Sequence, residues 1–536
     1  MRGVSAKSVC AVGLLVLLWL VFDGFKPERI FFTDDIALSM AVGKTALGGF
    51  PVLLGPPSHV GGRHLGGAYY WYVIITQLLS GGDDFKSLFL FTVWKLLAVL
   101  FICCLVWFLA GRRGRWWGCA GVLLAFCSPG YVSIIRTAWH NHFLLIPSVL
   151  VWAAFLAVLM RGLRCFPVFV LCSSILLQSH FSTAPMLLGL GAALMIFVWR
   201  RENGESWRRL FHPGWPGMSL YLAAALSWLP LVIYELRFPG SFGELLQARA
   251  RHTSLPSGLN AALEEIGNFW RVVFPGLRGR WVFGGLLLLC APLYAAWKEQ
   301  KTKTIAYTLG GVVLVFGSYA FFLSRLGAPL YSSYLYGALP VPALLAGLCA
   351  GSIADCYKAL TAFWRGRAVL VASIAGLIVI IAQTLVFDPD RRARDFVSYH
   401  SFEAARQMAE VIALDRQADE NQAAALHAAA LSRFNRDAVL YFLGPAFHGQ
   451  MQYWDLLREF PRGYTEPSRA YLLSCPQIYS AQIREFEAGL GPDWQFVKNI
   501  DVSSCALCRK CLLRRYQRSA AQYQGDLQKD PTHGDG

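Results

Sequence analysis

Charged residues are scarce in this sequence. Asp, Glu, Lys and Arg make up 15% of its 536 residues, compared with roughly 25% in an ordinary soluble domain. Acidic residues are the scarcer sign, with 33 against 49 Lys and Arg. The basic residues form short pairs between long apolar runs and make no stripe or tail, so we expect no nucleic-acid partner. With 55% hydrophobic residues, the composition indicates a protein surrounded by membrane lipids.

Three other features are missing. The first apolar run, residues 9–22, is followed by Asp23 without a small-x-small cleavage site, so we interpret it as an uncleaved first span and not a removed signal peptide. The Gly pairs at 48–49, 61–62 and 310–311 do not precede the Lys-Ser/Thr of a phosphate-binding loop. No internal repeat is visible, which counts against a transporter built from repeated halves.

Long apolar runs recur along the first 387 residues. A hydrocarbon core of about 30 Å needs roughly 20 apolar residues in helical form. By this rule the sequence predicts an all-α polytopic membrane protein with about 11 transmembrane helices. The expected spans are residues 9–25, 87–110, 116–134, 143–160, 165–180, 183–199, 216–234, 281–297, 304–323, 331–353 and 368–387.

The short connections predict the orientation, because Lys and Arg accumulate on the cytoplasmic side of a membrane. With the N-terminus in the cytoplasm, the inner turns hold most of the basic residues, and the odd number of spans places the C-terminal domain outside. Two outer loops, residues 26–86 and 235–280, are long, which points to a working face on the outside. Within the first, residues 68–79 are apolar but half a membrane long, so we expect an interfacial or partly re-entrant helix whose aromatics suit the interface.

Hydrophobicity drops after residue 387, which ends the predicted transmembrane catalytic domain, residues 1–387. Residues 388–516 have the size and the alternation of a small soluble α/β domain, and residues 517–536 form a polar tail that we expect to be disordered. The expected strands are 438–443, 470–474 and 494–502, and the expected helices are 404–416, 452–460 and 481–490.

Asp34 and Asp35 are the sharpest chemical feature. They follow the first span by under ten residues and begin an apolar helical pattern, so two neighbouring carboxylates are fixed near the outer membrane surface. Taken alone, the pair suits an N-cap and a first-turn acid, which the helix dipole favours. Their surroundings favour a catalytic role, because a Gly- and Pro-rich stretch, the residues Arg63 and His64, and the aromatic end Tyr69-Tyr70-Trp71 follow in the same loop.

This order resembles the first extracytoplasmic loop of the GT-C superfamily, particularly the lipid A aminoarabinose transferases and the protein O-mannosyltransferases. In those enzymes an acidic pair, usually Asp-Glu, follows the first span, and a basic-Pro-Pro-x-Tyr-Tyr-Trp-like element opens the next helix. This chain departs in two places: Gly66-Gly67 replaces the prolines, and the second acid is Asp35. The motif covers about 50 residues, while the topology and soluble tail extend the resemblance loosely over the chain.

The resemblance implies a glycosyltransferase of the inner (plasma) membrane that moves a monosaccharide from a polyprenyl-phosphate donor to a cell-envelope glycan, lipid or protein on the extracytoplasmic face. The phosphate is already a good leaving group, so one carboxylate base suffices and no acid is needed as in glycoside hydrolysis. Attack from the opposite face inverts the anomeric configuration. By the family pattern Asp34 is the base, and Asp35 orients it or binds the acceptor.

The departing phosphate needs cationic donors. The candidates are Arg63, His64 and Arg136, although Arg136 also suits interfacial snorkelling. His140 and His142 begin the fourth span, where a capping role is the alternative to substrate binding. The predicted substrate-binding residues are Arg63, His64, Tyr69, Tyr70, Arg136, His140 and His142.

No cofactor is required by this scheme. A divalent metal is the alternative, since His64, His140, His142 and His180 all fall near the outer face with the acidic pair, but we expect no metal ligands. In the tail, Cys505-x-x-Cys508-x-x-Cys511 and the upstream Cys475 would raise the prospect of zinc in a reducing compartment. Outside the cell they favour a structural disulfide between Cys475 and one of the other three.

Two other functions remain open. A transporter or flippase of lipid-linked sugars would place charged or broken helices at the bilayer midplane, whereas here the polar clusters sit at the outer ends of spans. A ligase or polymerase of lipid-linked polysaccharide shares the location but has a different main outer loop, and the acids directly after the first span argue against it.

Overall fold

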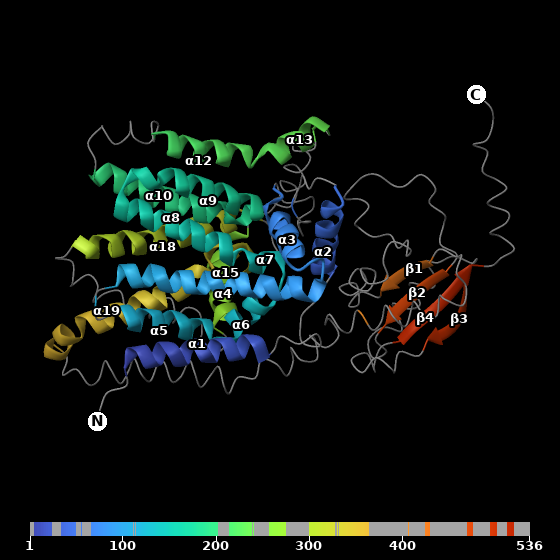
Figure 1. Cartoon of the computed structure of the whole chain (residues 1–536), viewed down its shortest axis with the longest axis horizontal. Helices are drawn as coiled ribbons and strands as arrows, with labels where there is room; N and C mark the ends of the chain where they lie inside the picture. Colours follow the sequence, from blue (N-terminus) through green and yellow to red (C-terminus); the bar gives the residue numbers. More distant parts are fainter. Residues whose placement is uncertain are drawn as a thin grey trace. The chain divides into compact units, whose positions relative to one another are not determined.

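The structure is a computed structural model of the whole chain (Figure 1). It describes residues 5–23, 34–49, 55, 66–110, 112, 114–201, 214–237, 239–240, 257–274, 300–326, 330, 332–363, 406, 424–428, 469–474, 494–500 and 512–518. The chain divides into two compact units. The first is Met1–Gly24 with Ala46–Pro389, and the second is Phe25–Thr45 with Asp390–Gly536.

The first unit is helical. Figure 1 shows its long helices running alongside one another, with the short helix α3 steeply inclined to them. The α-helices are α1 (Ala6–Asp23), α3 (Ala68–Leu79), α4 (Asp84–Leu109), α5 (Gly114–Phe126), α6 (Pro129–Arg136), α7 (His140–Phe143), α8 (Leu145–Arg161), α9 (Phe166–Ser179), α10 (Ala184–Arg201), α12 (Gly214–Leu226), α13 (Leu229–Arg237), α15 (Gly258–Val273), α18 (Gln300–Arg325) and α19 (Pro340–Phe363). Three 3₁₀ turns are η1 (Leu163–Cys165), η2 (Phe181–Thr183) and η3 (Ser332–Ala338).

The length rule holds for most of the expected spans. Within the described residues, six helical segments are long and apolar enough to cross a membrane, and two bent pairs pass the same test together. At the expected span 165–180, the apolar helical segment Leu163–Ser179 is observed, and it is slightly shorter than the 18 residues taken as the minimum for a membrane span. The expected spans at 281–297 and 368–387 lie outside the described residues. The membrane part of the chain is all-α and multi-pass, and the described residues hold eight of the eleven expected spans when each bent pair is counted as one.

One expected span is broken. Residues 116–134 were expected to form one helix, but α5 and α6 meet at an angle of 75°. Ser128 lies at the break, where its side chain accepts a hydrogen bond from the Tyr131 N–H, and Pro129 occupies the first turn of α6. Pro lacks the N–H that would continue α5, while a Ser cap followed by Pro favours a new helix start. The span at 331–353 is bent by 50° between η3 and α19.

Close packing at the break fixes α6. The Ser128 hydroxyl donates to the Val273 carbonyl at 2.6 Å, and the Tyr131 hydroxyl donates to the Leu339 carbonyl at 2.5 Å. A Cβ on Gly130 would lie 1.8 Å from the Val272 carbonyl oxygen. Helix α15 and Leu339, the residue before α19, therefore hold α6 in place, and with it the segment that leads to α7.

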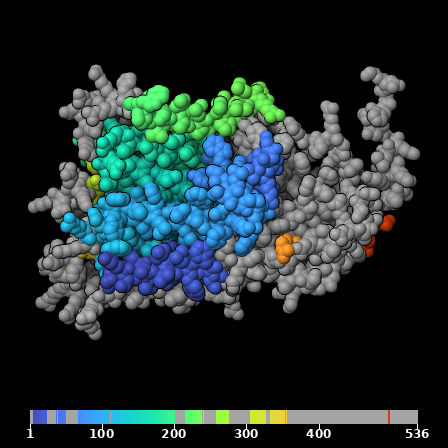
Figure 2. Space-filling view, in the orientation of Figure 1, coloured from blue at the N-terminus to red at the C-terminus, as the bar shows by residue number. Residues whose placement is uncertain are grey.

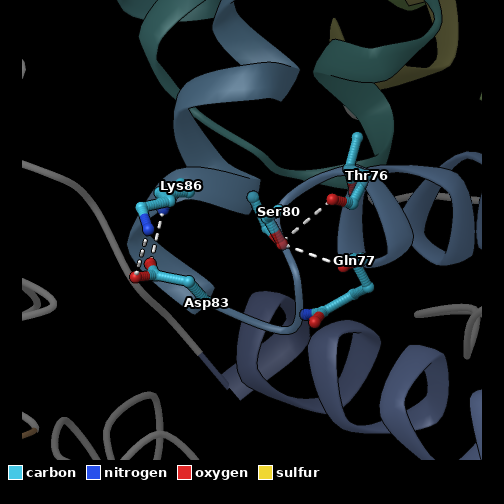
Figure 3. A network of polar contacts seen from close by, with 6 residues as sticks. Thr76, Gln77, Ser80, Asp83 and Lys86 are labelled. Atoms are coloured by element: carbon cyan, nitrogen blue, oxygen red, sulfur yellow. Dashed lines mark hydrogen bonds and ion pairs between the residues drawn. The ribbon is translucent and has the colours of Figure 1, made fainter.

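Helix α3 turns into α4 through a polar hairpin (Figure 3). The Ser80 hydroxyl bonds to the Gln77 carbonyl and to the Ser87 hydroxyl, at 3.0 and 2.7 Å. Asp83 caps α4 by accepting the Lys86 N–H at 2.9 Å, and this bond holds the pKa of the Asp83 carboxyl below its usual value. The observed bounds of α3, Ala68–Leu79, are those predicted.

Helices α12 and α13 lie on the surface of the first unit, where Figure 2 shows them in green. A polar network joins the break between them to α9. Trp228 Nε1 donates to the Ser174 hydroxyl at 2.8 Å, and the Gln178 amide donates to the Ser227 hydroxyl at 2.5 Å. Such bonds satisfy polar groups that have no partner in lipid.

The second unit contains α2 (Asp34–Leu47) as far as Thr45, and a sheet of four strands. The strands are β1 (Ala424–Ala428), β2 (Arg469–Ser474), β3 (Trp494–Ile500) and β4 (Leu512–Arg518), in the order β1-β2-β4-β3. β1 and β2 are parallel, and the other pairs are antiparallel. The strands expected at 470–474 and 494–502 are confirmed, while 438–443 lies outside the described residues. β4 includes Gln517 and Arg518, which the composition placed in the tail.

Candidate active site

Two tyrosines anchor the start of α3 in the protein interior. Tyr69 and Tyr70 are buried, with exposed fractions of 1% and 0%. The Tyr69 hydroxyl donates to the Ala138 carbonyl at 3.2 Å, and its ring lies 6.0 Å from that of His140. The ring of Tyr69 packs against Phe91 in α4 and Phe143 in α7, so protein surrounds both tyrosines, and the interfacial position of α3 stays a prediction.

Two histidines that are distant in sequence meet beside Tyr69. The rings of His140 and His180 are stacked, with centroids 5.9 Å apart and an angle of 12° between their planes. Nδ1 of His180 accepts the Ser182 N–H at 3.2 Å and lies 2.7 Å from the Ser182 hydroxyl. Because a backbone N–H can only donate, Nδ1 is an acceptor and the ring proton of neutral His180 sits on Nε2. The sequence suggested His180 only as a metal ligand, and the structure places its ring against that of His140.

His142, in the same short helix as His140, packs against two other aromatic rings. Its ring centroid lies 5.5 Å from that of Tyr336 in η3 and 5.1 Å from that of Trp139. Tyr336 lies within the expected span at 331–353, and sequence reasoning did not single it out. Four elements, α3, α7, η2 and η3, thus bring aromatic and imidazole rings together at one place in the first unit.

A buried lysine binds the end of α6, just before the segment that leads to α7. Lys95 lies in the middle of α4 and has an exposed fraction of 0%. Its ammonium donates to the Ile134 carbonyl at 2.9 Å and to the Thr137 carbonyl. These are carbonyls at the C-terminal end of α6, which have no partner in the helix and carry its negative partial charge. A charged group inside a span is costly and marks a functional or structural centre, so Lys95 could have been noticed from the sequence.

Arg136 has a structural contact. Its Nη2 donates to the Leu20 carbonyl near the end of α1, so one face of the guanidinium ties α6 to the first span. This contact is compatible with both interpretations of Arg136, and its role in phosphate binding stays a prediction.

Gly66 explains one departure from the family motif. A Cβ at this position would lie 2.4 Å from the Gln178 Cβ and 2.7 Å from its Cα. The end of the Gly-rich loop therefore touches α9 directly, two residues before His180. A proline or any other side chain here would displace α3 or α9.

The remaining predicted residues are placed less fully. Asp34 and Asp35 begin α2, in its first turn, a position that suits both the capping and the catalytic interpretation. Arg63, His64 and the four tail cysteines, Cys475, Cys505, Cys508 and Cys511, lie outside the described residues. Within the part of the chain that the structure describes, no three His, Cys, Asp or Glu side chains are grouped to hold a metal ion.

Comparisons with known proteins give a structural match only. No protein-family model and no curated protein matches the sequence. Two crystal structures of ArnT from Cupriavidus metallidurans, one bound to undecaprenyl phosphate and one in the apo state, match with a TM-score of 0.56 each. The chain has the fold of ArnT. The likeness covers 95% and 94% of this chain and 98% and 97% of ArnT, at 13% and 12% identity.

The match with ArnT confirms the fold that the first-loop motif predicted. It extends over the membrane helices and the C-terminal unit, although the sequence resemblance rested on about 50 residues. At this sequence identity the similarity establishes the fold, and it does not by itself establish a catalytic function. The chemistry has to come from the residues of this chain.

Proposed function

We propose that this protein is a GT-C-type glycosyltransferase that takes a monosaccharide from a polyprenyl-phosphate donor. The observation that carries the proposal is the ArnT fold over 95% of the chain, together with the undecaprenyl phosphate bound by one ArnT structure. The acceptor is a hydroxyl of a cell-envelope glycan, lipid or protein. The reaction takes place on the extracytoplasmic face of the inner membrane, with the N-terminus in the cytoplasm.

The proposed reaction is a single displacement. The acceptor oxygen forms a bond to the anomeric carbon as the bond from that carbon to the phosphate oxygen breaks, and the phosphate leaves with the electron pair. The acceptor proton passes to the Asp34 carboxylate, and Asp35 orients Asp34 or binds the acceptor. Attack from the face opposite the phosphate inverts the anomeric centre. Such a base contributes about 10²- to 10⁴-fold to the rate.

The test is a transfer assay in proteoliposomes with radiolabelled polyprenyl-phosphate sugar and an envelope extract as acceptor. Asp34→Asn should lower kcat by about 10²- to 10⁴-fold, because an amide keeps the shape of the side chain but accepts no proton. Asp35→Asn should lower it less or raise KM. Full transfer by both single variants and the double variant would refute the base assignment.

The chain supplies a matched control. Asp83 and Asp84 also form an acidic pair at a helix start, and Asp83 is a demonstrated N-cap. Asn is as good an N-cap as Asp, so Asp83→Asn should leave stability and transfer close to wild type. If Asp34 and Asp35 are only capping residues, their Asn variants will behave in the same way.

Two further outcomes separate the alternatives. A flippase would move the labelled lipid between leaflets and form no new glycosidic bond, which a fluorescent lipid and leaflet-specific quenching would detect. The proposed mechanism uses no metal, so transfer should survive EDTA. Loss of transfer that zinc or magnesium restores would require a metal in the scheme.

A further inference from the structure

Two cationic side chains lie over tryptophan rings at one end of helices α1, α4 and α5. The ammonium group of Lys7, in the first turn of α1, lies 5.8 Å from the centroid of the Trp116 ring. The guanidinium carbon of Arg115 lies 5.5 Å from the centroid of the Trp107 ring. The two tryptophan rings meet edge to face, with centroids 4.7 Å apart and planes at 88°. We call these four residues the cation–tryptophan cluster.

The cation–tryptophan cluster lies at the opposite end of α4 from the candidate active site. Trp107 is in the last turn of α4, whereas Phe91, near the start of the same helix, packs against the Tyr69 ring. The positions from Phe91 to Trp107 span about 24 Å at 1.5 Å per residue. A hydrocarbon core is about 30 Å thick. The cluster is therefore near one membrane surface and the candidate active site is near the other.

Packing between the helices holds the cluster in place. Both α1 and α4 run alongside α5 (Figure 1). The Cys10 thiol of α1 donates to the Trp116 carbonyl at 2.8 Å. One turn further along, a Cβ on Gly13 would lie 3.4 Å from the Leu123 Cβ, so α1 approaches α5 closely. The two rings and the two cations are thus positioned by three helices without any ligand.

Within the described part of the chain, the two cations have no counter-charge. The ion pair that is found there joins Lys86 to Asp83, and no carboxylate pairs with Lys7 or Arg115. The Nε atom of Arg115 is shielded from water and makes no hydrogen bond. A polar N–H that loses its water without gaining an acceptor is costly, and more so when the group is charged. An anion with several oxygen atoms would satisfy this group.

Membrane orientation alone does not account for this arrangement. Lys and Arg that set the orientation need only lie on the cytoplasmic side, and their long side chains usually extend into water. Arg115 instead lies over the Trp107 ring, with its Nε out of contact with water. A guanidinium whose face covers a ring still has its edge N–H groups, which match two oxygens of a phosphate.

We propose that the cation–tryptophan cluster binds the phosphate group of an anionic phospholipid in the leaflet opposite the candidate active site. Arg115 and Lys7 donate to the phosphate oxygens, and the exposed indole of Trp116 suits the headgroup region. The acyl chains lie along α1, where Val12 and Leu15 have exposed fractions of 58% and 66%. With the orientation given under the proposed function, this leaflet is the cytoplasmic one, whose surface is negatively charged.

The charges of the cluster distinguish among phospholipids. Lys7 and Arg115 supply two positive charges, and the headgroup of phosphatidylglycerol carries one negative charge and no positive one. Phosphatidylcholine has the same phosphate but adds a quaternary ammonium, which would be a third positive charge at this place. An anionic phospholipid should therefore bind more tightly than a zwitterionic one, and salt should weaken its binding.

The experiment measures lipid binding by the purified full-length protein in a neutral detergent, followed by native mass spectrometry. The probes are dioleoylphosphatidylglycerol, dioleoylphosphatidylcholine and inorganic phosphate. Phosphatidylglycerol should bind at least about tenfold more tightly than phosphatidylcholine, and inorganic phosphate should not displace it. In Arg115→Gln the Kd for phosphatidylglycerol should rise about tenfold, as expected for the loss of a hydrogen bond from a charged group.

Three further variants test the geometry. Arg161→Gln is the matched control, because Arg161 is an exposed residue at the end of α8 and its substitution removes the same charge. Its Kd should stay within about twofold of wild type, since exposed distant charges are screened. Arg115→Lys keeps the charge but loses the planar fork, so its Kd should lie between those of wild type and Arg115→Gln. Trp116→Leu should raise Kd about 2- to 5-fold.

Thermal unfolding separates lipid binding from folding. Arg115→Gln removes an Nε that has no partner, so its Tm without lipid should match that of wild type. Phosphatidylglycerol should raise the Tm of wild type and not that of Arg115→Gln. A lower lipid-free Tm in Arg115→Gln, with wild-type affinity for phosphatidylglycerol, would assign Arg115 to packing and overturn the inference.

Three other results would also overturn the inference. Equal affinity for phosphatidylglycerol and phosphatidylcholine would show that the cluster does not select an anionic headgroup. Equal losses of affinity in Arg115→Gln and Arg161→Gln would show that the basic residues act only through the general charge of this surface. Displacement of phosphatidylglycerol by inorganic phosphate would show a site for a soluble anion and not for a lipid.

Discussion

His140 and His180 stack face to face, with ring centroids 5.9 Å apart, although 40 positions separate them in the chain. His140 follows the broken span α5–α6, and His180 lies between α9 and α10. The contact therefore joins two membrane hairpins at one point. The Ser182 N–H fixes the orientation of the His180 ring, and Nδ1 of this ring caps the 3₁₀ turn η2.

Substitution of His180 separates its two roles. Asn keeps a hydrogen-bond acceptor at the cap, so the free energy of unfolding of His180→Asn should lie within a few tenths of a kcal/mol of the wild-type value. His180→Leu removes the acceptor and should lower the free energy of unfolding by about 1 kcal/mol. Both should reduce transfer by at least about tenfold, because both lose the imidazole. The measurements are thermal unfolding in detergent and the transfer assay. Wild-type transfer by His180→Asn would limit His180 to capping.

Lys95 should stabilise the fold by satisfying the end of α6. In Lys95→Met the carbonyls of Ile134 and Thr137 lose their donor, and we expect a loss of about 1–3 kcal/mol in the free energy of unfolding. Lys86→Met is the control on the same helix, since Lys86 makes only an exposed ion pair of 3.5 Å with Asp83, which is worth less than about 1 kcal/mol. Equal free energies of unfolding in the two variants would show that the Lys95 contacts contribute little to stability.

Much of the fold could be predicted because length and hydropathy decide which segments cross a bilayer. The bounds of α3 were predicted because Gly67 and the pair Gly81-Gly82 delimit its apolar run. The break at Ser128-Pro129 was missed although its signal is local, because an average over twenty apolar residues hides one cap and one proline. β4 was missed in part because three arginines, Arg514, Arg515 and Arg518, make its composition resemble a tail.

The site was harder to predict than the fold. His140 and His142 could be named because polar residues at the start of a span are conspicuous. Tyr336 could not, because it lies inside an expected span and meets His142 only through the packing of η3 against α7. Lys95 was overlooked because one Lys barely changes the mean hydropathy of a 26-residue helix.

Gly66 should not tolerate a side chain. Gly66→Ala places a methyl group against the backbone of Gln178, so α3 must move relative to α9, at a cost of about 1–3 kcal/mol. Transfer should also fall, because the shift separates Tyr69 from the histidines. Gly267→Ala, in α15, is the control, since a Cβ there meets no atom within 4 Å. Wild-type Tm and transfer in Gly66→Ala would contradict the tight contact.

The close approach of α5 and α19 leads to a last prediction, which concerns stability. A Cβ on Gly121 would lie 2.8 Å from the Ala346 carbonyl oxygen and 2.9 Å from the Ala350 Cβ. Small residues allow membrane helices to approach until their backbones are in van der Waals contact, which is the main source of their association in lipid. Gly121→Ala should therefore push the helices apart and destabilise the protein by about 1–3 kcal/mol.

Gly191→Ala in α10 separates this packing effect from helix propensity. A Cβ at Gly191 meets no atom within 4 Å, so the variant should gain up to about 1 kcal/mol from the better helix propensity of Ala. The two substitutions are chemically identical and both lie inside membrane helices, so the sign of the change in Tm depends on the neighbours alone. A Tm raised in both variants would mean that α5 and α19 are not in contact at Gly121.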